Sequence, residues 1–165
     1  GMDTLVGDLL AAARIDFEAV APRDLEVVDL ALRAAAQAGL DPDRVSFTGQ
    51  PGEVRADATL VSRALLGLLD NARRYGGREV TLSVDDLGER VQFTVEDDGP
   101  GFAPGDEIRA FEPFWRGPSA ARAPAGEGLG LALVRQIARA HGGEAGARTR
   151  DGGGARVWIA LPRRR

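Results

Sequence analysis

The sequence predicts an α/β sandwich in which helices cover one face of a mixed, largely antiparallel sheet. Two patterns predict this fold class. Apolar residues recur at helical spacing in some segments and alternate with polar residues, as in half-buried strands, in others. The chain has 165 residues, of which 44% are hydrophobic and 28% charged. These values suit one domain with a hydrophobic core of its own.

The first third of the chain contains two expected helices and two short strands. Residues 3–14 and 29–39 place apolar residues on one helical face, and Gly39 is a suitable stop for the second helix. Residues 44–48 and 53–56 have the length and the flanking turn residues of strands. We expect these two strands to pair with each other.

The longest expected helix follows, beginning after Asp57 and ending near the glycine pair at positions 76 and 77. Asp57 is a good N-cap because its carboxylate can accept from a free backbone N–H of the first turn. The buried stripe of this helix is expected to contain Leu60, Ala64, Leu65, Leu68, Leu69 and Ala72.

The second half of the chain is expected to hold four strands and one more helix, at residues 80–84, 91–95, 128–141 (the helix), 144–149 and 155–161. A turn over residues 85–88 connects the first two strands. Residues 97–127 are rich in Gly, Pro and Ala and have no long periodicity. A loop of this length inside a domain is usually functional or disordered.

Composition excludes several classes of function. There is no cysteine and no lysine, because all 21 basic residues are Arg. Disulfides, thiolate metal sites, Schiff bases and the lysine of a P-loop are therefore excluded. The single histidine, His141, excludes zinc motifs that need two. A net charge of −4 argues against a general nucleic-acid binder, and no apolar run approaches the roughly 20 residues that a transmembrane helix needs.

Three groups of residues can carry chemistry, and the first lies near the end of the long helix. Asn71, Arg74 and Tyr75 are spaced i, i+3 and i+4 and therefore share one helical face. An amide oxygen can ligate Mg²⁺, a guanidinium can pair with phosphate, and an aromatic ring can lie beside a base. An ordinary solvated helix face is the alternative interpretation.

The second group is Asp97-Asp98-Gly99-Pro100-Gly101, at the end of the strand expected over residues 91–95. A carboxylate at a strand end can accept a hydrogen bond from an exocyclic amine, and the glycines let the backbone approach a ligand without Cβ obstruction. The same residues are also an ordinary turn signal.

The third group is Gly126-Glu127-Gly128-Leu129-Gly130, entering the last expected helix, which starts near Leu129. Glycine-rich turns at helix N-termini present free N–H groups to phosphate. The spacing is neither that of the P-loop nor G-x-G-x-x-G, and no strand precedes it directly, which excludes a Rossmann interpretation.

In this order, the three groups resemble the boxes of the GHKL, or Bergerat-fold, ATP-binding domains. The most similar members are the catalytic (HATPase_c) domains of sensor histidine kinases. LLGLLDNARRY resembles the N box, DDGPG the G1 box, FEPFWRG the F box and GEGLGLALV the G2 box, and the resemblance runs from about residue 27 to residue 162. It implies the Bergerat fold, an α/β sandwich, and ATP with Mg²⁺ as ligands.

The resemblance also implies roles for individual residues. Asn71 would hold Mg²⁺ and, with Arg74, would be catalytic, while Asp97 would bind the adenine amine. The remaining nucleotide contacts would come from Tyr75, Gly99, Gly101, Arg116, Gly126, Gly128, Leu129, Gly130 and Leu131, with residues 116–127 as an ATP lid.

The family resemblance further implies a domain organisation. Residues 1–24 would be the remnant of a phosphotransfer-hairpin helix and its linker, and residues 25–165 the catalytic domain. The γ-phosphoryl group would pass to a His on a separate dimerisation and phosphotransfer domain of the same protein, and a response regulator would be an indirect partner. This part of the protein would be cytoplasmic, a location that includes the cytoplasmic portion of a membrane-anchored sensor, and would make no membrane or nucleic-acid contact of its own.

The sequence departs from the family pattern at two informative positions. Gly67, one turn before Asn71, stands where histidine kinases often have Asn and the ATPase relatives have a Glu base. Without a carboxylate there, phosphotransfer is favoured over hydrolysis. Glu127 replaces a small hydroxyl residue in the G2 box. The alternatives are a GHKL serine kinase of the anti-sigma-factor type and a degenerate nucleotide-binding regulatory module. His141 matches a structural position and not the phosphoacceptor.

Overall fold

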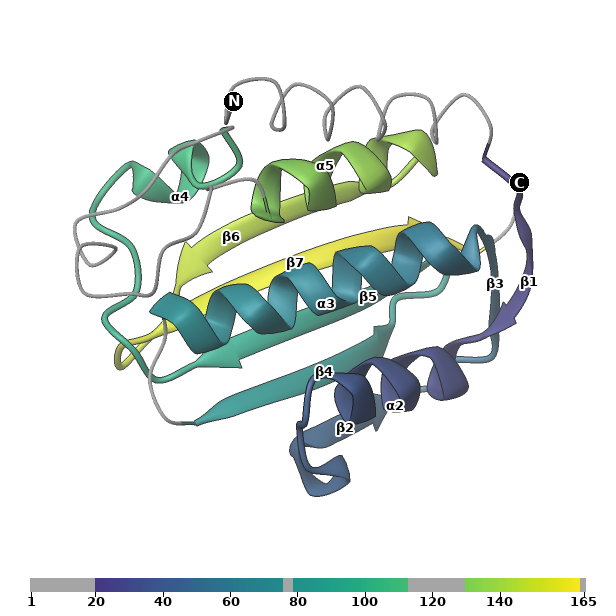
Figure 1. The fold of residues 1–165 in the computed structure, drawn as a ribbon, viewed down its shortest axis with the longest axis horizontal. Coiled ribbons are helices and arrows are strands. Elements are labelled where there is room, and N and C mark those ends of the chain that lie inside the picture. The colour runs from purple at the N-terminus through teal and green to yellow at the C-terminus, as the bar shows by residue number, and fades with distance from the viewer. Residues whose placement is uncertain (1–19, 76–78, 113–129, 164–165) are drawn as a thin grey trace, which may run out of the picture.

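A computed structural model describes residues 20–75, 79–112 and 130–163 (Figure 1). Its elements are β1 (Arg23–Glu26), α2 (Val27–Gln37), the 3₁₀ turn η1 (Pro42–Arg44), β2 (Val45–Thr48), β3 (Glu53–Ala56), α3 (Ala58–Tyr75), β4 (Val80–Asp86), β5 (Arg90–Asp97), α4 (Asp106–Arg109), α5 (Gly130–Ala140), β6 (Glu144–Thr149) and β7 (Ala155–Pro162). The expected helix over residues 3–14 lies outside the described residues.

A five-stranded sheet forms one layer of the domain, with its strands in the order β2-β4-β5-β7-β6. β2 and β4 are parallel, and the other neighbouring pairs are antiparallel. Figure 1 shows α2, α3 and α5 lying together over one face of this sheet. The predicted fold class, helices on one face of a mixed and largely antiparallel sheet, is therefore confirmed.

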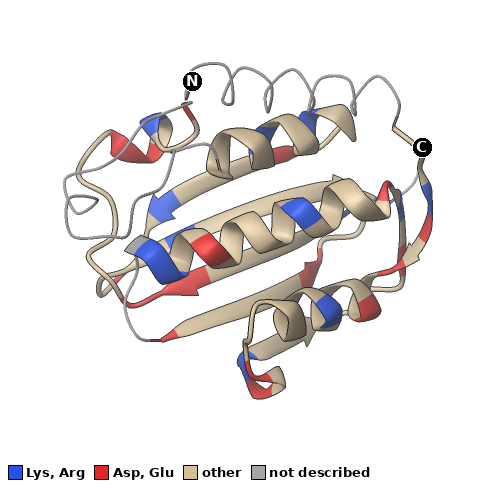
Figure 2. Cartoon of the chain, in the orientation of Figure 1, with Lys and Arg blue, Asp and Glu red and all other residues tan. Residues whose placement is uncertain are grey.

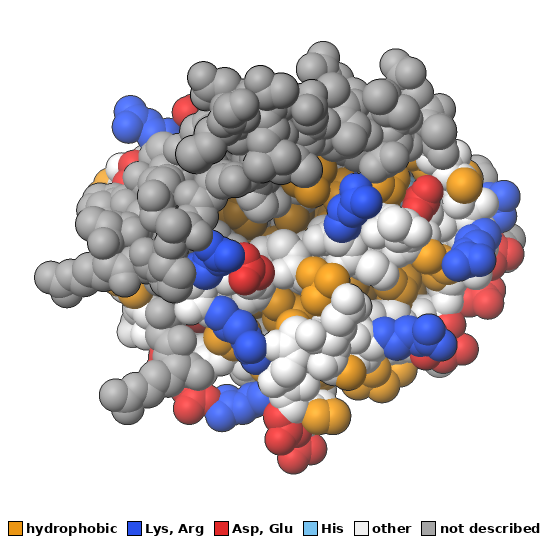
Figure 3. Space-filling view, viewed as in Figure 1, with side chains coloured by type: hydrophobic (Ala, Val, Ile, Leu, Met, Phe, Trp, Pro, Cys, Tyr) orange, Lys and Arg blue, Asp and Glu red, His pale blue; other side chains and the backbone are white. Residues whose placement is uncertain are grey.

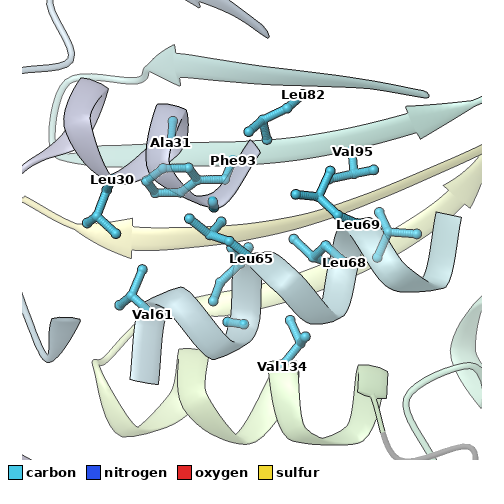
Figure 4. Packing of buried hydrophobic residues seen from close by; sticks show 14 of the residues in the cluster. Leu30, Ala31, Val61, Leu65, Leu68, Leu69, Leu82, Phe93, Val95 and Val134 are labelled. Atoms are coloured by element: carbon cyan, nitrogen blue, oxygen red, sulfur yellow. The ribbon is translucent and has the colours of Figure 1, made fainter. Parts of the chain in front are cut away.

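The core lies between α3 and the sheet. Leu65 and Leu68 of α3 and Phe93 of β5 are fully buried (Figure 4). Phe93 is paired with Val84 of β4 and Ile159 of β7, which makes a continuous apolar row across three strands. Burying a Leu or Phe side chain contributes about 1.5–3 kcal/mol, so this row and the α3 stripe together hold the helix against the sheet.

The expected pairing of residues 44–48 with 53–56 is wrong, although both segments are strands. β2 pairs in parallel with β4, and β3 pairs antiparallel with β1 in a separate two-stranded sheet. The connection between them is therefore not a hairpin turn. Within it, Asp86 accepts from the N–H of Gln50, and the Arg163 guanidinium donates to the carbonyl of Gln50. Strand β1 was not expected, and it crosses the expected boundary between residues 24 and 25.

One imidazole joins the start of α3 to the end of α5. Asp57 caps α3 as expected, because its Oδ1 accepts from the Leu60 N–H at 3.1 Å. The backbone N–H of Asp57 donates to Nε2 of His141 at 3.0 Å, and Nδ1 of His141 lies 2.8 Å from the carbonyl oxygen of Ile137. Both ring nitrogens therefore have structural partners, which agrees with a structural role for His141.

The polar elements of interest gather at one end of the sheet. Figure 1 shows the C-terminus of α3, the end of β5, the start of α5, α4 and the β6–β7 turn at the left end of the view. Figure 2 marks charged residues on α2, α3 and α5. In the described parts of the chain, no helix combines the length and apolar character that crossing a membrane requires.

Candidate functional site

Asp97, the last residue of β5, is a buried carboxylate. Only 3% of the residue is exposed. Its Oδ1 accepts hydrogen bonds from the backbone N–H of Gly99 at 2.9 Å and from that of Ala155 at 3.2 Å. Burial raises the pKa of Asp97 above its ordinary value, while these two hydrogen bonds act in the opposite direction. A buried acid of this kind at a strand end is a candidate functional group.

The glycine turn after Asp97 packs directly on the β6–β7 hairpin. Gly101 has a φ of 75°, and a Cβ there would lie 2.8 Å from the Thr149 side chain and 2.9 Å from the Gly154 carbonyl oxygen. The Thr149 hydroxyl accepts from the N–H of Phe102 and donates to its carbonyl. Position 101 therefore requires glycine, both for its φ and for this close approach.

The β6–β7 hairpin also contacts the Asp97 carbonyl, and the sequence did not predict these contacts. Gly154 has a φ of 97°, and a Cβ built on it would lie 1.9 Å from the Asp97 carbonyl oxygen. Nη1 of Arg150 donates to the same carbonyl at 2.8 Å, and Nε of Arg150 pairs with the Glu96 carboxylate at 3.0 Å. The glycine run over residues 152–154 was a visible turn signal, but the partners of Arg150 depend on strand pairing.

The last turn of α3 carries Asn71, Arg74 and Tyr75, as expected, on one helix at the same end of the sheet as Asp97. Asn71 is partly buried. Nε of Arg74 pairs with Oδ2 of Asp70 at 2.9 Å, and Figure 3 shows charges of opposite sign adjoining on this surface. Tyr75 ends the helix, and its side chain lies outside what the structure describes.

Gly67 lies where α3 and α5 approach each other. A Cβ at this position would lie 3.2 Å from Val134 Cγ2 and 3.6 Å from the carbonyl oxygen of Gly130. The glycine therefore has a packing role, because a larger side chain would push against the first turn of α5. The sequence had indicated only a missing base at this position.

The last helix begins at Gly130, and Leu131 is buried beneath it with 5% exposed. The start of α5 is thus placed at the same end of the sheet as Asp97 (Figure 1). The other expected contact residues of this region, Arg116, Gly126, Gly128 and Leu129, lie outside the described residues, as does the expected lid over residues 116–127.

A short helix, α4, lies in the expected loop over residues 97–127. Arg135 of α5 contacts Phe111, which lies just after α4. Its Nη2 donates to the Phe111 carbonyl at 3.3 Å, and its guanidinium lies 5.6 Å from the Phe111 ring centre. Phe111 is the first residue of FEPFWR, so this motif begins against the helix that follows the glycine-rich turn.

Comparison with known proteins gives consistent matches. Residues 56–165 match the family described as histidine kinase-, DNA gyrase B- and HSP90-like ATPase. The sensor protein RstB of Escherichia coli (strain K12) is 38% identical over 172 residues, covering 98% of this chain and 39% of RstB.

Two solved structures extend the comparison. The structure of the mycobacterial sensor histidine kinase MprB superposes with a TM-score of 0.72 at 28% identity, covering 86% of this chain and 99% of that one. Full-length ShkA in complex with AMPPNP superposes with a TM-score of 0.69 at 26% identity, covering 97% of this chain and 36% of ShkA. The chain thus spans less than half the length of RstB and of ShkA.

Proposed function

Because this chain belongs to the family of histidine kinase-, DNA gyrase B- and HSP90-like ATPases, we propose that it is the ATP-binding catalytic domain of a two-component sensor histidine kinase. The observation that carries the proposal is the buried Asp97 carboxylate, held at the end of β5 beside a glycine turn. It lies at the end of the sheet where α3 ends and α5 begins. RstB and MprB, named as sensor proteins, support the assignment to this branch of the family.

Asp97 would recognise the adenine ring. Its Oδ1 is engaged by two backbone N–H groups, so we assign Oδ2 as the acceptor for the exocyclic amine. An ionised carboxylate can only accept hydrogen bonds, and it therefore favours a base with an amine at this position. Gly99 and Gly101 let the chain turn closely beside the base, and Tyr75 would flank it.

Asn71, Arg74 and the start of α5 would bind the triphosphate. The Asn71 amide oxygen is a hard ligand of the kind that Mg²⁺ prefers, and Mg²⁺ is commonly bound through one or two protein oxygens together with substrate phosphates. When bound, the ion neutralises charge that develops on the phosphates. The Arg74 guanidinium would bind phosphate, either in place of Asp70 or while still paired with it. Gly126, Gly128, Leu129, Gly130 and Leu131 would present N–H groups at the helix N-terminus, with Arg116 contributing from the lid.

The acceptor is proposed to be a His of a separate dimerisation and phosphotransfer domain in the same protein. The residues above position ATP and stabilise charge on the transferred group, and the γ-phosphoryl passes to the imidazole of that His. A response regulator would receive it afterwards. We place this domain in the cytoplasmic part of the sensor.

Two alternatives remain as outcomes of the test. A degenerate regulatory module was suggested by Gly67 and Glu127, but the contact of Gly67 with α5 gives this glycine a packing reason. A GHKL serine kinase would share the nucleotide boxes and would phosphorylate Ser on a partner protein.

Calorimetry with Mg-ATP tests the binding step. We expect the chain to bind and Asp97→Asn to bind weakly, because Asn must turn its oxygen toward the two N–H donors and present its NH₂ to the adenine amine. Asp98→Asn is the matched control, since Asp98 is the exposed neighbour and accepts from the Glu79 N–H. Equally negligible binding by the wild-type chain and both variants would favour the degenerate module.

Transfer is tested by adding the phosphotransfer hairpin of the full-length protein and labelled ATP. Acid-labile phosphohistidine on the hairpin is expected, and acid-stable phosphoprotein would indicate a serine kinase. Absence of phosphohistidine with a chain that binds Mg-ATP would refute kinase competence.

A further inference from the structure

Asp97 lies at a point where the sheet no longer holds it on one side. Toward β4, Asp97 is still in register with Val80. Toward β7, the last pair is Glu96 with Arg156, so Asp97 is one residue beyond the paired strand. Its carbonyl oxygen is held there by a side chain, the Arg150 guanidinium, at 2.8 Å.

The same guanidinium makes a second contact that orients it. Nε of Arg150 pairs with Oε2 of Glu96 at 3.0 Å, and the two side chains are 36% and 26% exposed. A planar guanidinium held at two edges presents its donors in a fixed direction. Gly154 completes the hold, because its lack of a side chain lets the hairpin meet the Asp97 carbonyl directly.

We propose that Arg150 is a positioning residue that holds Asp97 in the orientation required for a purine amine, and so sets the preference for ATP over GTP. This inference rests on the proposed function. Arg150 binds the main chain of Asp97, while the Ala155 N–H from the same hairpin binds its Oδ1. Together they hold the backbone and the carboxylate of one residue, which leaves Asp97 little freedom to rotate.

The selectivity follows from the chemistry of position 6 of the purine. Adenine carries an amine there, which donates to a carboxylate, whereas guanine carries a carbonyl oxygen, which a carboxylate repels. A carboxylate held in place applies both effects. A carboxylate free to turn away applies neither, so releasing Asp97 weakens ATP binding and leaves GTP binding unchanged or improved.

The charge of Arg150 adds a second, separable signature. The charged neighbours of Asp97 are Glu96 and Asp98, which adjoin it in the chain, and Arg150 on the hairpin. Asp98 acts to raise the pKa of Asp97 and Arg150 to lower it. Removing the guanidinium is therefore expected to raise the pKa of Asp97 further, and ATP binding should then decline at a higher pH as the solution is acidified.

The test compares Arg150→Met, which keeps an apolar stem, with Arg148→Met as the matched control. Arg148 is an exposed residue of β6, two residues before Arg150. Dissociation constants for Mg-ATP and Mg-GTP are measured by calorimetry, and the Asp97 carboxyl is titrated by ¹³C NMR without nucleotide. Arg150→Met should weaken ATP binding by about tenfold, the scale of one charge-assisted hydrogen bond, and lower the ATP-to-GTP preference by the same factor. Arg150→Lys, which keeps the charge but not the planar fork, should be intermediate.

The outcomes separate the two proposals. Equal weakening of ATP and GTP, or an unchanged preference, would overturn the role of Arg150, since general damage to the fold affects both nucleotides alike. If the wild-type chain binds neither nucleotide, the proposed function fails. The carboxyl titration then decides whether Arg150 controls Asp97: a shift in Arg150→Met alone supports that control, and no shift overturns it.

Discussion

Gly154→Ala tests how closely the hairpin must approach Asp97. The added methyl group would lie 1.9 Å from the Asp97 carbonyl oxygen, where real Cβ contacts are not found below 3.0 Å. One of the two groups must therefore move by about 1 Å. Overpacking of this kind costs about 1–3 kcal/mol, and placing Ala at a φ of 97° costs about 1–2 kcal/mol more.

Gly153→Ala is the matched control for this substitution. Gly153 also has a positive φ, 106°, but a Cβ there meets nothing within 4 Å. The control should lose only the backbone term of about 1–2 kcal/mol, and Gly154→Ala about 2–5 kcal/mol. Denaturant unfolding measures both, and calorimetry with Mg-ATP should show at least tenfold weaker binding for Gly154→Ala alone. Equal losses of stability and affinity in the two variants would refute the reasoning.

Three further perturbations follow from the structure. Hydrogen bonds from Gly88, Gln50 and Arg163 lower the pKa of Asp86 from 3.8 to about 2, so its stabilising effect is present above pH 4 and lost as the pH falls toward 2; in Asp86→Asn, that part of the acid dependence of unfolding should disappear. Burial raises the pKa of Asp97, which favours the folded state at low pH and disfavours it as the pH rises; Asp97→Asn should therefore raise the melting temperature near neutral pH, and a lower value would contradict this sign. Gly67→Ala should change stability by less than about 1 kcal/mol, because helix propensity opposes the 3.2 Å contact with Val134; Gly67→Val should lose about 1–3 kcal/mol in denaturant unfolding, and a neutral result would exclude close packing there.

The sequence predicted the elements whose signals are local and long. α3 combines a capping Asp57 with an apolar stripe over four turns, and no competing interpretation fits that pattern. α4 is a single turn of four residues and leaves almost no periodicity to detect. The predicted pairing of β2 with β3 was wrong because a four-residue strand carries little information about its partner. In the structure, β2 pairs with β4, and Arg163 contacts the segment between β2 and β3.

The candidate site divides in the same way. Asp97, Gly101 and Asn71 could be singled out from motifs, because each motif lies within a few consecutive residues. Arg150 could not, since an arginine near a hairpin turn is usually a solvated surface residue. Its contact with Asp97, 53 residues earlier in the chain, arises only when β7 pairs with β5 and β6 with β7. Gly67 was singled out for the group it lacks, whereas the structure relates it to the neighbouring helix.

The His141 imidazole links the start of α3 to the end of α5. This link lies at the end of the helix pair opposite to the end of β5, and the two helices approach each other at Gly67. The Asp57–His141 hydrogen bond therefore ties the two helices together at this end. Because the chain has a single histidine, its ring resonances can be assigned directly by NMR. They provide a probe of the contact between α3 and α5.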